Sequence, residues 1–513
     1  MAAQESTNQT APPIYQSPNA PPAGTPPVAP PPPENNPEGA NFVGEKPIST
    51  GAPASVVATP GAPGTPGETG EVVTSSRSKF PKKLLIILLV LALLGSASYL
   101  VYKYVLTGRT ANTAVELTWW GLWEDEALVR PVIEKYESEN PNVNITYVKQ
   151  AKEDYRERLT NAIIRGDGPD IFRYHNTWVP MFSEYLAPLP SSVMSPSSYT
   201  QTFYPVATND LAVGTNIYGI PLEYDGLVMF VNNEHFENAG IAAPDNWDKI
   251  REVARQLTIK DEEDAILQSG IALGTVENVD HWEEIVALMM LQNGADPAKP
   301  NNELAQDALV FYTLFNTQDE VWDETMPPST VAFANGLVSM YIAPSWRAFN
   351  IKETNPTLDF KAVVLPQLPK ETGTEPDVSY ATYWVEGVSS KSANKEAAWQ
   401  FLKFASEEEN LQQLYSTASQ TRAFGEPYSR IDMRELLLDD PYLGALMSQA
   451  GDAKSWYLAS RTYDGTTGIN SQVSEYYKDA VNSLLAEESP EEVTLTLEQG
   501  LQQVLSRYNL ISN

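Results

Sequence analysis

Apolar and polar positions change their pattern twice along the chain. Residues 1–83 hold few strongly apolar side chains, Leu84 to Tyr102 is an apolar run of 19 residues without a charge, and the remainder alternates short apolar patterns with polar breaks. The hydrocarbon core of a bilayer needs roughly 20 apolar residues as a helix, and only a helix satisfies the backbone of an isolated segment in lipid. The run therefore predicts one transmembrane helix, over residues 84–105.

Basic residues flank this run unequally. Four precede it and two follow it: Arg77, Lys79, Lys82 and Lys83 before, Lys103 and Arg109 after. Because basic residues concentrate on the cytoplasmic side of a membrane segment, we expect residues 1–83 in the cytoplasm and residues 111–513 outside. The alternative, a cleaved signal peptide, has an apolar stretch of about 7–15 residues close to the N-terminus. This run is longer and starts after 83 residues, which favours an uncleaved single-pass signal anchor in the cell membrane.

The segment after the run alternates strand and helix patterns. Val115–Trp120 is an apolar strand pattern, residues 143–148 alternate with a period of two, and residues 171–172 form a short third strand. Apolar positions spaced three and four apart predict helices over residues 128–136 and 155–163. The order β-α-β-α-β predicts a parallel sheet with right-handed crossovers, and ligands of such sheets sit beyond the carboxyl ends of the strands.

The segments on either side of the apolar run also differ in composition. Residues 1–76 contain 17 of the 40 prolines, so we expect a disordered tail that acts as a spacer or as a ligand for a cytoplasmic polyproline-binding module. Residues 111–513 carry 60 acidic and 27 basic residues, which argues against nucleic acid or anionic lipid as their partner. The absence of cysteine excludes disulfides, thiol nucleophiles and a lipid-modified N-terminal cysteine.

Four groups of motifs occur in an order that carries a family resemblance. They are Trp119-Trp120-Gly121-Leu122-Trp123 with Asn140-Pro141-Asn142-Val143, then Gly168-Pro169-Asp170-Ile171-Phe172, then Tyr218 to Asp225 with Val231 to Phe236, and finally Ala332 to Gly336 with Ala343-Pro344-Ser345-Trp346 and Gly387-Val388-Ser389. Their order and spacing resemble the family 1 extracellular solute-binding proteins, the maltose-binding-protein-like substrate-binding components of ABC transporters. The likeness covers about residues 113–510.

The resemblance implies an α/β fold of two lobes with the ligand in the cleft between them, and delivery of the solute to an ABC permease. We expect lobe 1 over about residues 113–220 and 388–425, and lobe 2 over about residues 227–382 and 440–513. The resemblance also implies three crossings between the lobes, near Tyr218–Gly226, Tyr383–Ser389 and Thr421–Leu443. Members of the family are usually secreted or lipid-anchored, so a retained helix would depart from the common pattern and puts free diffusion of the binding protein in doubt.

Aromatic and polar side chains near strand ends are the candidate ligand contacts. All 11 tryptophans lie within residues 111–513. The apolar faces of sugar rings pack on flat aromatic side chains, and sugar hydroxyls need hydrogen-bond partners because unpaired buried polar groups are costly. This chemistry suggests a mono- or oligosaccharide. From strand ends and from positions that line the cleft in the family, the candidates are Trp120, Trp123, Asn176, Trp178, Tyr224, Asp225, Trp346, Arg347, Trp384, Arg422 and Trp456.

Several of these candidates have a structural alternative. Successive strand residues point to opposite faces, so at least one of Trp119 and Trp120 is expected in the core. Trp178 could pack under its own loop, and the carboxylate of Asp225 could cap the hinge. Tryptophans that fall in helix patterns are expected in the core: Trp247, Trp282, Trp322 and Trp399.

No sequence motif points to a catalytic centre, a metal site or a cofactor. Walker A, G-x-S-x-G and H-E-x-x-H motifs are absent from the sequence. His175, His235 and His281 lie in separate segments, and we expect them to be structural or exposed rather than ligands. Two alternatives stay open. One is a membrane-tethered carbohydrate sensor with the tail as its output, and the other is a glycoside-acting enzyme, which needs only two carboxylates.

Overall fold

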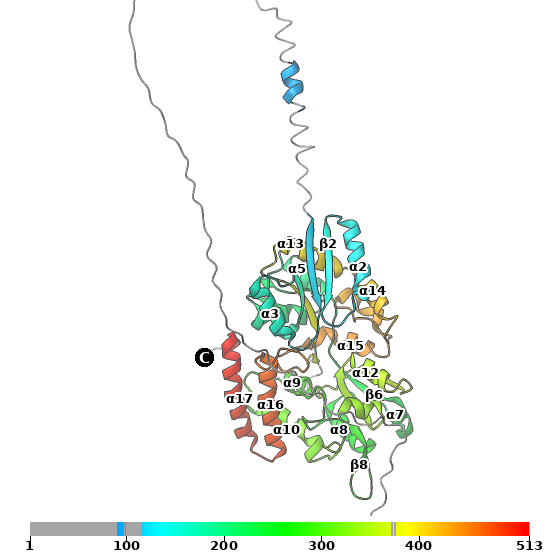
Figure 1. Cartoon of the computed structure of the whole chain (residues 1–513). Helices are drawn as coiled ribbons and strands as arrows, with labels where there is room; N and C mark the ends of the chain where they lie inside the picture. Colours follow the sequence, from blue (N-terminus) through cyan, green and yellow to red (C-terminus); the bar gives the residue numbers. More distant parts are fainter. Residues whose placement is uncertain (1–89, 97, 99–113, 371–372, 374–375, 512–513) are drawn as a thin grey trace, which may run out of the picture. The chain divides into compact units, whose positions relative to one another are not determined.

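The structure is a computed structural model that describes residues 90–96, 98, 114–370, 373 and 376–511 (Figure 1). The predicted tail and most of the predicted anchor over residues 84–105 lie outside the described residues. Within the described part of the chain, no helix is both long and apolar enough to cross a bilayer.

The first sheet confirms the strand and helix order predicted from the sequence. Its order is β12-β3-β1-β2, with β1 parallel to β2 and β3 and β12 antiparallel to β3. Trp119 on β1 is buried against Tyr147 and Phe401, as expected for one of the two neighbouring tryptophans. The elements of this lobe are β1 (Val115–Gly121), α2 (Glu126–Glu139), β2 (Val143–Lys149), α3 (Tyr155–Arg165), β3 (Ile171–His175), β12 (Trp384–Val388), α13 (Lys395–Ala405) and α14 (Glu408–Ala418).

The second sheet has the order β10-β6-β9-β8-β7. Strand β6 is antiparallel to β9 and β10, and β8 runs parallel to β9. Its strands are β6 (Leu227–Asn232), β7 (Ile259–Lys260), β8 (Ile266–Ile271), β9 (Val338–Pro344) and β10 (Phe360–Val363). Its helices are α7 (Asn233–Ala239), α8 (Trp247–Leu257), α9 (Trp282–Gln292), α10 (Glu303–Thr317), α11 (Ser329–Ala334), α12 (Arg347–Thr354), α15 (Gly444–Gln449), α16 (Ile469–Leu485) and α17 (Pro490–Leu505).

Short elements connect the two sheets and complete each lobe. They are η2 (Asn176–Trp178), α4 (Val179–Phe182), α5 (Pro196–Thr202), α6 (Pro205–Leu211), β4 (Ala212–Val213), β5 (Asn216–Ile217), β11 (Ser379–Tyr380), η3 (Ile431–Leu437), η4 (Ala450–Asp452), β13 (Ala453–Lys454) and η5 (Ser506–Tyr508). Strands β11 and β13 pair in parallel with each other.

The segments that pass between the sheets run side by side. The chain leaves the first sheet before β6 and returns to it at β12, and Gly226 pairs antiparallel with Ala381. A side chain at position 226 would collide with the carbonyl oxygen of Tyr380, so this close approach needs glycine. The lobe limits given above stay a prediction, but the two α/β sheets and the crossing pair between them are the architecture expected.

Candidate functional site

A cavity of about 430 Å³ lies between the ends of the two sheets. Its wall comes from the loop after β1, the end of β3, the first crossing, the end of β9 with the start of α12, the start of β12, and the loops at residues 422–427 and 460–463. Pockets for small ligands typically measure about 300–1,000 Å³ and combine apolar walls with a few polar groups. The cavity falls in that range.

Three aromatic side chains form one wall of the cavity. Trp123 follows β1, Trp384 begins β12 and Tyr463 comes from the C-terminal part of the chain. The ring centroids of Trp123 and Trp384 are 5.5 Å apart at 75°, and that of Tyr463 lies 5.7 Å from Trp123. All three are only partly buried, so the wall presents aromatic surface to the cavity.

A tryptophan and an arginine stand at the end of β9. The Arg347 guanidinium lies 4.5 Å from the ring centroid of Trp346 and covers part of that ring. The ring of His281 meets Trp346 edge-on, at 5.6 Å. The exposed remainder of Trp346 and the guanidinium of Arg347 both line the cavity.

The carboxylate of Asp225 sits at the first crossing and points toward backbone N–H groups. It accepts hydrogen bonds from the N–H of Gly226 at 2.7 Å and of Ser345 at 3.1 Å, and the N–H of Trp346 lies 3.4 Å away. Burial raises the pKa of Asp225 to about 7, against the opposing effect of these hydrogen bonds. Asp225 therefore ties the first crossing to the end of β9 and also lines the cavity.

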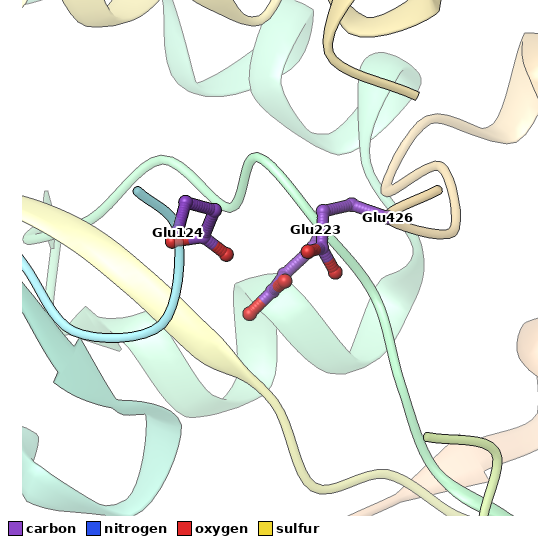
Figure 2. A group of neighbouring side chains, drawn as sticks. All are labelled: Glu124, Glu223 and Glu426. Carbon is purple, nitrogen blue, oxygen red and sulfur yellow. The ribbon is translucent and has the colours of Figure 1, made fainter. Parts of the chain in front are cut away.

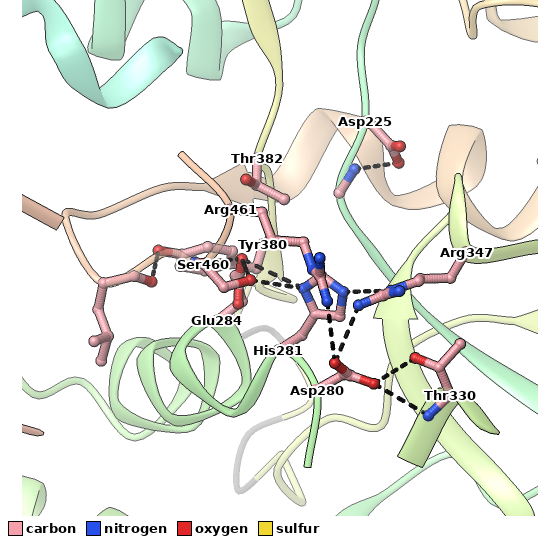
Figure 3. Close-up of polar contacts among 12 residues, drawn as sticks. Asp225, Asp280, His281, Glu284, Thr330, Arg347, Tyr380, Thr382, Ser460 and Arg461 are labelled. Carbon is pink, nitrogen blue, oxygen red and sulfur yellow. Dashed lines mark hydrogen bonds and ion pairs between the residues drawn. The ribbon is translucent and has the colours of Figure 1, made fainter. Parts of the chain in front are cut away.

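A relay of hydrogen bonds joins Arg347, His281, Ser460 and Glu284 (Figure 3). Arg347 Nε donates to His281 Nε2 at 2.8 Å, so the proton of the neutral imidazole lies on Nδ1, 2.9 Å from Ser460 Oγ. Ser460 in turn donates its N–H and its hydroxyl to Glu284, at 2.8 and 2.9 Å. Burial lowers the pKa of His281. The relay holds Arg347 and Ser460 in fixed orientations at the cavity wall.

Carboxylates gather at the other end of the cavity, around the buried Arg173. Oxygens of Glu124, Glu223 and Glu426 all lie within 4.8 Å of one another (Figure 2). Arg173 Nη1 contacts Glu124 at 2.7 Å, and Arg173 Nη2 contacts Glu386 at 2.7 Å. Carboxylate oxygens are ligands that a hard cation accepts, so these three glutamates are the candidate cation ligands among the described residues.

Six of the predicted ligand residues line the cavity: Trp123, Asp225, Trp346, Arg347, Trp384 and Arg422. They come from the ends of strands in both sheets, from the segment before β6 and from the loop after α14. That these residues contact a solute stays a prediction.

The structure places the other five predicted ligand residues away from the cavity wall. Trp178 is fully buried and stacks on Phe182, because η2 turns its ring into the lobe. Asn176 is buried too, and it donates to Asp210 at 2.8 Å.

The remaining three predicted ligand residues, which do not line the cavity, are Tyr224, Trp456 and Trp120. Tyr224 packs on Tyr204, Trp456 lies against Tyr477, and Trp120 is half-buried on the face of β1 opposite Trp119. Trp178 still supports the wall from behind, since its ring lies 5.7 Å from that of Trp384.

Several cavity residues were not among the predicted ligand residues. His175 and His281, expected to be structural or exposed, are both buried in the cavity wall. His175 is the last residue of β3, and this position at a strand end could have pointed to it. Nothing local marks His281, Ser460 or Arg461, because residues far apart in the chain bring them together.

Comparison with known proteins decides the family. Residues 121–412 match the family model described as bacterial extracellular solute-binding protein. The chain belongs to this family. It is 21% identical over 305 residues to the multiple sugar-binding protein of Streptococcus mutans, covering 57% of this chain and 71% of that one. It is 23% identical over 313 residues to the maltotriose-binding protein of Pyrococcus abyssi, covering 58% of this chain and 63% of that one.

Solved structures agree with this family at the level of the fold. The cyclic α-maltosyl-1,6-maltose binding protein from Arthrobacter globiformis aligns with a TM-score of 0.62 at 17% identity, over 77% of this chain and 99% of that one. A likeness at this identity shows the two-lobe α/β solute-binding fold. Members of the family are substrate-binding proteins rather than enzymes.

Proposed function

We propose that this protein binds a sugar or oligosaccharide between its two lobes, as the solute-binding component of an ABC importer. The observation that carries the proposal is the cavity itself. An aromatic wall of Trp123, Trp384 and Tyr463 can cover the C–H face of a sugar ring, and Asp225 and Arg347 offer an acceptor and a donor for its hydroxyls.

The relatives support the same ligand class. The Streptococcus mutans relative is a multiple sugar-binding protein, and the Pyrococcus abyssi relative binds maltotriose by name. Since their sequences are 21% and 23% identical to this chain, they support the class of ligand and leave its length and linkage to experiment.

The test is a saccharide panel with a matched pair of tryptophan variants. The full-length chain in detergent is screened by thermal shift, and sugars that stabilise it are measured by calorimetry. Truncating an aromatic anchor at the centre of a binding site typically costs about 2 kcal/mol or more, which is roughly a 30-fold loss of affinity. We expect that loss for Trp384→Ala, and an unchanged affinity for Trp120→Ala, because Trp120 does not line the cavity. Binding that is insensitive to Trp384→Ala, or no stabilisation by any saccharide, would contradict the proposal.

We further propose that residues 84–105 hold the protein in the cell membrane as an uncleaved anchor, with the solute-binding domain outside and the tail in the cytoplasm. The charge-free apolar run and the basic residues before it support this orientation. Membranes washed with alkaline carbonate should retain the protein, and protease added to spheroplasts should remove the solute-binding domain. Release by the wash would refute the anchor.

Delivery of the bound sugar to a permease completes the proposal. Deleting the gene should abolish uptake of the labelled sugar, and uptake that continues unchanged would favour a sensor over a transport component. Neither result of the uptake assay tests whether the protein binds a sugar, which the saccharide panel decides separately.

A further inference from the structure

The carboxyl groups gathered below the cavity outnumber the cations that contact them. Four carboxyl groups stand against two guanidinium groups, which leaves an excess of two negative formal charges. The carboxyl groups are those of Glu124, Glu223, Glu386 and Glu426, and the guanidinium groups are those of Arg173 and Arg422. We call the four carboxyl groups the carboxylate cluster. All of them except Glu386 line the cavity, so the excess charge faces the space in which a solute would lie.

Glu223 is the member of the carboxylate cluster that lacks a close cation. Arg173 contacts Glu124 and Glu386 at 2.7 Å but lies 3.8 Å from Glu223. Among the described residues, none donates a hydrogen bond to the Glu223 side chain, although only 8% of this residue is exposed. A buried carboxylate without donors is costly until a cation or a donor reaches it. Because Glu223 lines the cavity, a bound solute can supply that group.

The cations elsewhere in the cavity wall do not compensate the carboxylate cluster. At the start of α12, Arg347 and Arg461 both pair with Asp280, at 3.2 and 3.3 Å, and Glu284 lies in the adjoining hydrogen-bond relay. Two cations therefore meet two carboxylates at that end of the cavity. Lys152 also lines the cavity, but it is exposed, and water solvates an exposed charge without a protein partner. The carboxylate cluster is thus the part of the wall where a buried charge lacks its counter-ion.

The spacing of the three lining carboxylates suits an ammonium group. One oxygen from each of Glu124, Glu223 and Glu426 lies within 4.8 Å of the other two (Figure 2). A nitrogen equidistant from three atoms at this spacing lies about 2.8 Å from each, which is the length of a charge-assisted N–H···O bond. An ammonium group carries three N–H donors, one for each carboxylate. Both oxygens of Glu124 already accept from Arg173, which disfavours Ca²⁺, because that ion takes about 6–8 oxygen ligands.

We propose that the preferred solute is an amino sugar whose ammonium group binds between Glu124, Glu223 and Glu426. The inference rests on the proposed function, because it names the substrate class of the same cavity. Glu124 follows Trp123 directly in the chain, and both line the cavity. The aromatic plate for the sugar ring and a carboxylate for the ammonium group therefore belong to one loop. A neutral sugar fills the same cavity but leaves the excess negative charge uncompensated.

The experiment compares sugars that differ in one group, by calorimetry on the full-length chain in detergent. Glucosamine and 6-amino-6-deoxyglucose are measured against glucose, N-acetylglucosamine and glucuronic acid, and the β-1,4-linked dimer of glucosamine is measured against cellobiose. The measurements are made at pH 7, where amines with pKa values of about 7.7 and above are mainly cationic. We expect the best amino sugar to bind about 10- to 100-fold more tightly than its neutral counterpart, because hydrogen bonds between charged groups are the stronger ones. Glucuronic acid should bind most weakly.

Two variants connect this preference to the carboxylate cluster. Glu223→Gln keeps the volume of the side chain and removes its charge, so the ratio of the two affinities should fall about tenfold. Should that variant fail to fold, Glu426→Gln removes another of the three lining carboxylates and should lower the same ratio. Asp210→Asn is the matched control: this carboxyl group lies outside the cavity wall and accepts from Asn176 at 2.8 Å. The control should keep the wild-type ratio.

The outcomes separate the inference from the proposed function. Equal affinities for amino and neutral sugars, or a preference that survives both glutamate variants, would overturn the inference and leave sugar binding in place. Tighter binding of glucuronic acid would overturn it too. So would thermal stabilisation by CaCl2 alone that disappears in Glu223→Gln, since the cluster would then be a metal site. If no sugar of the panel binds, charged or neutral, the proposed function fails and the inference falls with it.

Discussion

Replacing Arg173 by methionine tests how much the buried charge network depends on its cation. Methionine keeps the unbranched apolar stem and removes the guanidinium, which contacts Glu124 at 2.7 Å and Glu386 at 2.7 Å while only 3% of the residue is exposed. The substitution leaves these carboxylates buried without a counter-ion. Breaking a buried ion pair by removing one partner costs about 3–5 kcal/mol.

The two contacts share a single cation, so we place the expected loss at the upper end of that range, about 5 kcal/mol. Part of the loss returns at acidic pH. Burial already raises the pKa of Glu386 to about 7 beside Arg173, and without the guanidinium that pKa rises further. The folded variant then binds more protons than its unfolded chain, so its deficit shrinks as the pH falls.

The assay is urea unfolding of the full-length chain, followed by tryptophan fluorescence at pH 5 and pH 8. Arg165→Met is the matched control: Arg165 lies at the end of α3 in the same lobe, and its side chain is 62% exposed beside Asp167. An exposed pair contributes about 0–1 kcal/mol. Equal losses for the two variants, or an Arg173→Met deficit that does not shrink at pH 5, would refute the reasoning about burial.

Two further predictions concern the crossing and the cavity wall. Gly226→Ala should lower stability by about 1–3 kcal/mol, because the added methyl group meets the carbonyl oxygen of Tyr380. Gly451→Ala is the control, because a methyl group there meets no atom within 4 Å. An unchanged urea midpoint for Gly226→Ala would contradict the close approach. Burial lowers the pKa of His175 to about 3. As the pH drops below about 6.5, the unfolded chain therefore takes up a proton on this histidine before the folded protein does. The free energy of unfolding then falls by at most about 1.4 kcal/mol per pH unit. His175→Gln should flatten this part of the stability curve against pH, and an unaltered slope would show that His175 is not the group that titrates.

The sequence by itself determined the local elements and the family. Strand and helix periods placed β1, β2, β3 and α3 within a few residues of their observed bounds, and the left-handed Gly166 ends α3 because a glycine takes that conformation without strain. These features depend on neighbours within one or two turns of chain, so a single sequence contains them.

The tertiary structure decided which side chains face the cavity. Trp178 follows a strand end as a ligand residue would, but the turn of η2 sends its ring into the core. His281 meets Ser460 across 179 positions. The carboxyl groups of Glu223 and Glu426 lie within 4.8 Å of each other, although Glu223 precedes β6 and Glu426 follows α14. Such pairs arise when separate segments pack together, and no local period records that packing. The charge states of these buried groups were therefore also beyond the reach of the sequence, since they depend on the water and the counter-ions that packing removes or supplies.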